Sequence, residues 1–321
     1  MRLWKLRLSM IGTLAAIIGL STLFFTAILY LLNVNLLLLP ILVVAFNITQ
    51  WLVAPYLIDA MYNVREVSRS ENPWLHRVVE RLSERSGIRK PRVMLAQIPI
   101  PNAFAYGSPI AGSRVAVTQG LLDTLEPEEV EAVIGHELGH LKHRDVQVMM
   151  FVSMLPAIFY YLGYSLLLSS GYGRREEEGG GALAIGMLSL FLYWVLTLLT
   201  LHLSRLREYF ADRHSATIVE DGPRKLSEAL AKIQYAARRL KLASPHVSGL
   251  HSFKSLFITD PDRAELDVAE LTGYSSPDQR LVQEILRRRV TLADQLMELF
   301  STHPNIVKRI RALKELERQL A

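Results

Sequence analysis

The sequence predicts a mainly α-helical, multi-pass membrane protein with a small β-sheet and a metal-binding domain that a pair of membrane helices divides into two parts. Three observations support this fold class. Half of the 321 residues are apolar, and charged residues, at 21%, are fewer than in a typical soluble domain. Four long apolar runs carry almost no charge. The string His-Glu-Leu-Gly-His, residues 136–140, lies between the second and third runs.

The first two runs, residues 8–32 and 36–58, predict an N-terminal transmembrane hairpin over residues 1–58. Both are long enough, because a helix needs about 20 apolar residues to cross a bilayer. The first run is longer than the apolar core of a cleavable signal peptide, and no typical cleavage site follows it. The alternative is that some runs are buried core helices of a soluble protein. This alternative fits the second and third runs better than the first and fourth.

Residues 59–145 are predicted to form the first part of the metal-binding domain. Residues 92–96 and 115–118 are short β-type runs, and residues 102–106 lie between them. A strand edge beside a metal site can bind an extended peptide by backbone pairing. Candidate substrate-binding residues are therefore Asn102, Ala103, Phe104 and Ala105. From these residues alone, a hairpin that only packs beneath the helices is equally consistent.

The segment from Pro127 to Asp145 predicts one helix, with Pro127 and two glutamates in its first turn. Residues four apart share a helical face, so the imidazoles of His136 and His140 can converge on one metal ion. Glu137 lies beside them, where a carboxylate can reach a water at the metal instead of the metal itself, as zinc-assisted hydrolysis requires. Two unrelated surface histidines are the alternative, but the string is specific and its helical setting is the required one.

His143 and Asp145 are poor candidates for a third ligand. Catalytic zinc usually has three protein ligands and one open position. Seven residues of unbroken helix would separate His143 from His136 by about 10.5 Å, and no glycine interrupts the helix after His140. We expect His143 at the surface or behind the ligands. We expect Asp145 to pair with Arg144 or another base, or to cap a neighbouring element.

The third apolar run, residues 146–169, and the fourth, residues 182–203, predict a second transmembrane hairpin over residues 146–203. Residues 204–321 are predicted to form the second part of the domain. Residues 204–216 predict a helix that continues out of the fourth apolar run. Glu208 and Asp212 lie four apart on this helix, so one could bind the metal while the other orients a metal-bound histidine. From the charge pattern alone, an ordinary solvated helix is the better interpretation.

Basic residues predict that both parts of the domain lie in the cytoplasm. Arg2, Lys5 and Arg7 precede the first run, whereas the turn at residues 33–35 has no charge. The positive-inside rule therefore places the N-terminus in the cytoplasm, and each pair of crossings returns the chain there. The net charge of +5 fits helices close to anionic lipid.

Two classes of partner or cross-link are not expected. No base-reading motif or aromatic–basic pattern accompanies the positive charge, so we expect no nucleic-acid binding. The chain has no cysteine, so it has no disulfides, and any metal must be held by imidazole and carboxylate.

Four strings together resemble the HtpX-type membrane zinc metalloproteases, gluzincins related to the CAAX prenyl proteases. In chain order they are P-N-A-F-A-Y-G at 101–107, H-E-L-G-H-L-K-H-R-D at 136–145, R-E-Y-F-A-D at 207–212, and S-T-H-P at 301–304, followed by Arg309. Their order and spacing are specific, and the similarity covers nearly the whole chain. Residues 256–296 fit the pattern less closely and are interpreted as a family-variable insertion.

The resemblance implies one Zn²⁺ per subunit, held by His136, His140 and Glu208, with Asp212 as a supporting carboxylate. Glu137 would be the general base. It also favours substrate contact by residues 102–105. We expect Pro304 to begin a new helix, so that His303 could donate to a developing oxyanion and Arg309 could support a carboxylate near the site. A purely structural role for His303 is equally consistent.

By the same resemblance, the chain would be an endopeptidase of the prokaryotic inner membrane that acts from the cytoplasmic side in a stress-related quality-control role. Its partners would be the lipid bilayer and misfolded or surplus membrane proteins or unfolded polypeptides. One alternative is a catalytically inactive zinc-binding membrane adaptor, although the intact Glu137 argues against it. The other is a processing protease for lipidated peptides, for which more than four spans would be expected.

Overall fold

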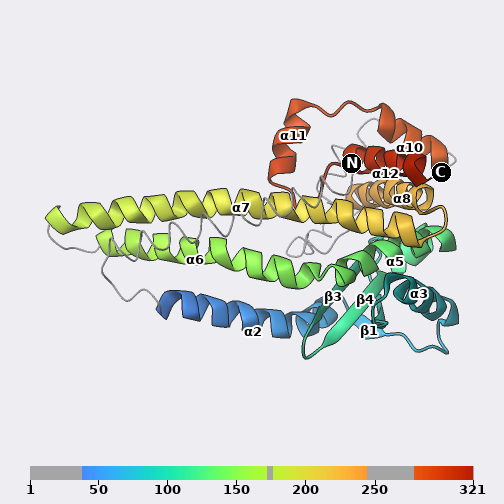
Figure 1. The fold of residues 1–321 in the computed structure, drawn as a ribbon, viewed down its shortest axis with the longest axis horizontal. Coiled ribbons are helices and arrows are strands. Elements are labelled where there is room, and N and C mark those ends of the chain that lie inside the picture. Colours follow the sequence, from blue (N-terminus) through green and yellow to red (C-terminus); the bar gives the residue numbers. More distant parts are fainter. Residues whose placement is uncertain (1–37, 172–175, 244–277, 321) are drawn as a thin grey trace. The chain divides into compact units, whose positions relative to one another are not determined.

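The structure, a computed structural model, describes residues 38–171, 176–243 and 278–320. The first predicted apolar run, residues 8–32, lies outside the described residues, as does part of the variable insertion. Most described residues are helical, and one small sheet accompanies the helices (Figure 1), as the sequence predicted.

Figure 1 shows the described helices and strands. In chain order they are α2 (Leu38–Met61), β1 (Val64–Glu66), α3 (Pro73–Ser86), β2 (Arg92–Ala96), β3 (Ala103–Ser108), β4 (Gly112–Thr118), α4 (Gln119–Thr124), α5 (Pro127–Lys142), α6 (Asp145–Gly171), α7 (Glu176–Ile218), α8 (Gly222–Ala243), α10 (Asp278–Arg287), α11 (Leu292–Leu299) and α12 (Ile306–Leu320).

The chain divides into two compact units. Of the described residues, one unit contains those of Leu52–Val146 and Arg205–Ala321, and the other contains those of Arg2–Trp51 and Gln147–Ser204. All the candidate site residues lie in the first unit. Its main core joins α3, the inner strands, α5, α8, α10 and α12, with fully buried residues such as Leu82, Val133, Leu230 and Ile310.

The sheet has the strand order β1-β2-β4-β3, so β3 forms one edge. β2 and β4 are parallel, whereas β1 and β3 are antiparallel to their neighbours. Side chains of one strand alternate between the two faces of a sheet. Accordingly, Ala103 of β3 belongs to the main core, and Phe104 and Tyr106 belong to a separate cluster with Ile58 and Tyr62 at the end of α2.

The predicted helix over residues 127–145 is wrong at its C-terminal end. α5 begins at Pro127, as expected, with a capping box between Glu126 and Glu129. It ends at Lys142, and α6 begins at Asp145 after a turn in which Arg144 has a φ of 55°. This left-handed conformation is uncommon for a residue with a side chain. Because of this turn, Asp145 does not continue α5 but begins α6.

Two helices among the described residues are long and apolar enough to cross a membrane, α6 over Asp145–Leu167 and α7 over Gly181–Ile218. They carry the third and fourth predicted runs. In the second unit their buried residues form one cluster that includes Phe159, Leu162 and Leu196. α7 is continuous, so the fourth run leads without a break into residues 205–218 of the first unit.

Candidate metal centre

The side chains of His136, His140 and Glu208 converge in the first unit. Each offers one ligand atom, and these atoms all lie within 4.8 Å of one another. The Nε2 atoms of His136 and His140 are 3.2 Å apart. The Glu208 oxygens lie 3.5 Å from the His140 Nε2 and 3.6 Å from the His136 Nε2. Helix α5 supplies both histidines, and the C-terminal part of α7 supplies the glutamate.

Close packing of α5 on α7 makes this convergence possible. Gly139 lies between the two histidines in sequence, and a Cβ atom there would be only 3.0 Å from the Cα of Ala211 on α7. A side chain at position 139 would therefore push α7, and Glu208 with it, away from the histidines. This glycine in the His-Glu-Leu-Gly-His string has a packing reason of its own.

Each histidine is oriented by its own carboxylate. The Nδ1 of His136 lies 2.9 Å from Asp212, and the Nδ1 of His140 lies 2.6 Å from Asp145. In a neutral imidazole, an Nδ1 that donates a proton leaves a lone pair on Nε2. The two Nε2 lone pairs then face the same point, an arrangement that is repulsive unless a cation lies between them.

An arginine in turn holds each of these carboxylates. Arg309 donates from Nε and Nη2 to Asp212 at 2.9 and 2.5 Å, and its Nη1 lies 3.2 Å from Glu208. Arg207 forms an ion pair with Asp145. The residues around the three donors thus include two Arg–Asp–His series. Arg309, which the sequence analysis expected to support a carboxylate near the site, lies against Asp212 and Glu208.

The donor set fits zinc. Zinc binds imidazole nitrogen and carboxylate oxygen at about 2.0–2.2 Å in a tetrahedral arrangement, which puts two nitrogen ligands about 3.4 Å apart; the observed Nε2 separation is close to that value. The charges also fit, since two buried arginines face four buried carboxylates: Glu137, Asp145, Glu208 and Asp212. When all four are ionised, two negative charges remain, and a divalent cation offsets them.

Glu137 lies next to the three donors without being one of them. Its side chain is buried, and its Oε2 accepts a hydrogen bond of 2.8 Å from the backbone N–H of Ala105 on β3. Burial raises the pKa of the Glu137 carboxyl, although the neighbouring histidines act in the opposite direction. A raised pKa brings a carboxylate closer to the range in which it can accept and return a proton.

The electrostatics of the two histidines differ. Burial lowers the pKa of His136, but the carboxylates of Asp212 and Glu208 close to its ring more than offset this and raise the pKa to about 9. The pKa of His140 is lowered, because the effect of burial exceeds that of the Glu208 charge, which would raise it. A metal ion at this centre therefore competes with a proton for the His136 ring.

The remaining predicted residues lie around this centre in different ways. His303 is buried, with its Nε2 3.8 Å from Glu208 and its Nδ1 2.9 Å from the Thr302 hydroxyl. The helix predicted to begin at Pro304 begins two residues later, at Ile306, because the Asn305 side chain accepts from the backbone N–H of Val307 at 2.9 Å.

The four candidate substrate residues are spread along β3. Asn102 is paired with Thr118, whose N–H donates to its carbonyl, and the Phe104 ring packs on Tyr62 and Tyr106. The backbone of Ala105 reaches the centre through its hydrogen bond to Glu137. In this segment the Phe104 side chain packs within the fold, whereas the Ala105 backbone contacts the centre.

His143 and Asp145 differ from one another. The Nδ1 of His143 bonds to the Gly139 carbonyl and its ring packs against Phe210 and His214, away from the three donors. Asp145 pairs with a base other than Arg144, as one of the predicted options had it, but its bond to His140 was missed. The sequence contains only a weak signal for the bond between Asp145 and His140, because predicting it requires recognising the turn at residues 143–144.

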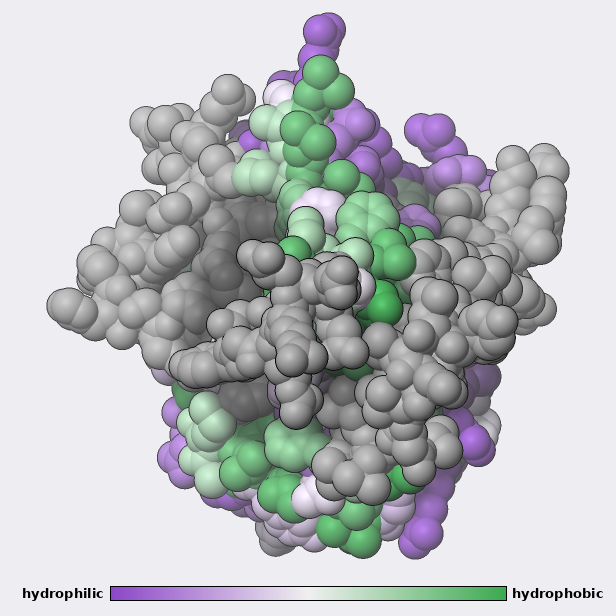
Figure 2. Space-filling view, turned by 90° about the vertical axis from the view of Figure 1, so that its left-hand side faces the viewer, coloured by the Kyte–Doolittle hydropathy of each residue, from purple (hydrophilic) through white to green (hydrophobic). Residues whose placement is uncertain are grey.

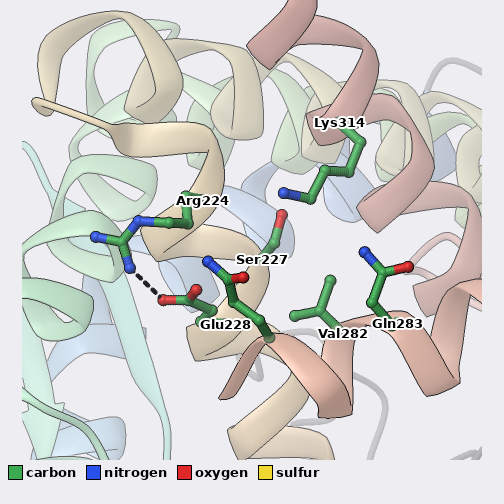
Figure 3. A pocket seen from close by; sticks show the side chains of 7 residues that line it. Arg224, Ser227, Glu228, Val282, Gln283 and Lys314 are labelled. Atoms are coloured by element: carbon green, nitrogen blue, oxygen red, sulfur yellow. Dashed lines mark hydrogen bonds and ion pairs between the residues drawn. The ribbon is translucent and has the colours of Figure 1, made fainter. Parts of the chain in front are cut away.

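A separate small cavity lies away from the metal centre, between α8, α10 and α12 (Figure 3). It has a volume of about 20 Å³, and none of its lining residues is one of the three donors. Arg224 in its wall bonds to Glu228 at 2.6 Å. A space of this size holds about one water molecule, so we assign it no ligand.

The chain matches known proteins over most of its length. A family model described as "Peptidase family M48" matches residues 69–317. The "Protease HtpX homolog" of Aeropyrum pernix is 40% identical over 282 residues, which cover 87% of this chain and 85% of the relative. The protein of the same description from Thermoplasma acidophilum is 36% identical over 308 residues, covering 91% and 90%.

One solved structure has the same fold. The crystal structure of S. mikatae Ste24p aligns with a TM-score of 0.56 and 16% identity, covering 97% of this chain and 66% of that chain. At this identity the likeness concerns the fold alone. It agrees with the mainly helical architecture and the small sheet predicted from the sequence.

Proposed function

Because the chain belongs to peptidase family M48 and is thus a metalloprotease, as its resemblance to HtpX-type enzymes predicted, we propose that it is a zinc-dependent endopeptidase of membrane proteins. We further propose that its active site faces the cytoplasm and that it removes misfolded or surplus proteins. The observation that carries this proposal is the convergence of His136, His140 and Glu208 beside the buried Glu137.

In this proposal each residue of the centre has one task. His136, His140 and Glu208 hold one Zn²⁺ per subunit, which when bound polarises the scissile carbonyl and makes water more acidic. Glu137 accepts a proton from the attacking water and delivers it to the leaving amine. Asp212 and Asp145 fix the two imidazoles through their Nδ1 atoms.

The edge of β3 is the proposed binding site for the substrate backbone. Ala105 directs its N–H away from β4 and towards Glu137. In an antiparallel pair, residues two apart share this direction, so the backbone groups of Ala103 face the same open edge. An extended peptide that pairs with this edge would bring a carbonyl close to Glu137. Asn102 and Phe104 would support the strand through their buried contacts.

We assign supporting roles to two residues from the C-terminal part. His303 would donate a hydrogen bond to the oxyanion that develops during attack, a role supported by its Nε2 lying 3.8 Å from Glu208. Arg309 holds Asp212 and balances the charge of Glu208. Neither residue is proposed as a metal ligand.

The proposed setting is a prokaryotic inner membrane. The domain would be cytoplasmic in two parts, residues 59–145 and 204–321, separated by a membrane hairpin over 146–203 and preceded by another over 1–58. The continuity of α7 from apolar residues to Glu208 supports a site close to the bilayer, where membrane proteins and unfolded polypeptides are within reach.

Proteolysis by detergent-purified protein tests the proposal. Unfolded casein should be cleaved, a chelator should stop cleavage, and added Zn²⁺ should restore it, with about one zinc bound per chain. A zinc-loaded chain that cleaves no unfolded protein would instead support a membrane adaptor. Cleavage confined to lipidated peptides would support the processing alternative.

A further inference from the structure

Helix α11 exposes its apolar residues and buries its acidic ones. Leu292, Leu296 and Phe300 retain 78%, 62% and 59% of their accessible surface, and Met297 and Leu299 are also exposed. Asp294 and Glu298, by contrast, are buried. Helices at the surface of a soluble domain show the opposite arrangement. This helix lies at the end of the segment to which the sequence assigned no chemistry.

Hydrogen bonds hold the acidic residues in their inward position. Asp294 accepts from the N–H and the hydroxyl of Thr291, which caps the helix, each at 2.8 Å. Glu298 accepts from the N–H of Asn305 at 3.2 Å and pairs with Lys308. Turning the helix over would break these bonds and leave buried charges unpaired. The exposure of the leucines is therefore a fixed property of this part of the fold.

The outward face of α11 has no formal charge. Between Leu292 and Phe300 the only exposed residue with a polar side chain is Gln295. An apolar surface of this kind indicates that the helix binds a membrane or another protein. Figure 2 shows that apolar side chains lie next to hydrophilic ones on the face of the described residues that it draws.

Arg205 fixes α11 to a defined position on α7. Its Nη1 donates to three backbone carbonyls at the C-terminal end of α11. These are the carbonyls of Glu298 at 2.7 Å, Leu299 at 3.3 Å and Ser301 at 2.7 Å. Arg205 is the first formally charged residue after the apolar run of α7 that ends at Leu203. Two residues of helix span about 3 Å. The end of α11 is thus attached where the apolar run stops.

We propose that α11 is an interfacial helix that lies on the anionic surface of the bilayer that α7 enters, with Leu292, Leu296 and Phe300 among the acyl chains. Apolar faces of such helices lie about 5–10 Å into the headgroup and acyl boundary. Charge complementarity supports this partner, since the exposed Arg287 and Arg289 lie five and three residues before the helix and suit anionic headgroups.

The position of α11 has a consequence for the metal centre. Phe300 is followed at once by the loop that carries His303, and Arg205 lies one helical turn before Glu208 on α7. A membrane-bound α11 would therefore hold the His303 loop at a fixed depth near the bilayer.

Fluorescence quenching in vesicles tests the interfacial helix directly. The cysteine-free chain allows single-cysteine variants Leu292→Cys and Leu296→Cys, each labelled with a polarity-sensitive fluorophore, and the exposed Ser70→Cys is the control. The full chain is reconstituted in vesicles of phosphatidylcholine and phosphatidylglycerol. Nitroxide lipids should quench roughly half or more of the fluorescence at both leucine positions, because the labels lie at acyl-chain depth. Aqueous iodide should quench only the control.

Two results would overturn the proposal. Iodide quenching at positions 292 and 296 as strong as at position 70 would show that this face is in water. Protection from both quenchers would show that protein covers it, either a second copy or residues 244–277 of the same chain. The measurement needs no catalytic activity, so its failure and that of the proposed protease function are distinguishable. Unchanged zinc content in both leucine variants verifies that they are folded.

Discussion

Two aspartates, each held by an arginine, determine how the histidines of the metal centre are oriented. Asp212 and Asp145 contact the Nδ1 atoms of His136 and His140 at 2.9 and 2.6 Å. Carboxylates in this position fix the ring and its tautomer, and their loss typically lowers metal affinity by about 10- to 100-fold. The two imidazoles are thus prepared for a metal before it binds.

We predict that Asp145→Asn lowers zinc affinity by about 10- to 100-fold, because the amide no longer favours the tautomer that leaves Nε2 free. Competition with a chromogenic chelator measures the affinity. Asp123→Asn is the matched control and should leave the affinity unchanged, because this exposed aspartate only accepts a hydrogen bond from its neighbour Gln119 in the described part of the chain. Equal affinity in Asp145→Asn and wild type would remove Asp145 from the metal centre.

The third ligand is predicted to be Glu208 and not His143. Glu208→Ala should lose most of the bound zinc and the activity, because a buried donor is removed from the group of three. His143→Ala should retain both, since its Nδ1 is bonded to the Gly139 carbonyl. Metal analysis of the two purified variants checks the order, and the opposite order would show the assignment to be mistaken.

At the scale of elements, the centre depends on the distance between α5 and α7. Both helices approach closely at Gly139, where there is no room for a side chain beside the backbone of Ala211. The same contact sets the distance between the histidines of α5 and Glu208 of α7. A small change in helix spacing should therefore appear first in metal binding.

Gly139→Ala should weaken zinc binding, because the added methyl group must displace α7 by a few tenths of an ångström. Alanine also favours helix by about 1 kcal/mol over glycine, so thermal stability is the wrong readout and zinc affinity the right one. Gly181→Ala is the matched control, because a Cβ atom there meets nothing within 4 Å. If both variants bind zinc like the wild type, the helix contact does not control the centre.

Sequence reasoning succeeded where one local pattern determines an element. The strand over residues 92–96, the start of the motif helix at Pro127 and the helical continuation beyond the fourth run all follow from such patterns. It failed at Arg144, whose left-handed conformation no local propensity indicates. The role of Asp145 depends on that turn and on Arg207 from a distant part of the chain, so the sequence alone could not reveal it.

At the scale of the whole molecule, one metal ion cannot be shared across a bilayer. His140 and Glu208 flank the apolar residues of α6 and α7, so these helices must cross as a pair or not at all. A single crossing would separate the ligands by about 30 Å of hydrocarbon. The arginine-rich residues 59–145 predict which side they share.

Cysteine labelling of intact cells checks this orientation. In the cysteine-free chain, Ser70→Cys and Gln279→Cys should resist an impermeant thiol reagent, whereas Gly180→Cys should be labelled. Labelling after cell lysis provides the control for reactivity. Strong external labelling at position 70 would reverse the orientation, and protection at position 180 would argue against full crossing by α6 and α7.

The most direct test of the metalloprotease centre is zinc content and casein cleavage measured together on purified Glu137→Gln. This substitution keeps the shape and much of the hydrogen bonding of the side chain but removes its proton acceptor, while the three donor residues stay intact. The variant should bind as much zinc as the wild type and cleave at least about 10²-fold more slowly. Full zinc content with cleavage close to the wild-type rate would contradict the role of Glu137 as the base.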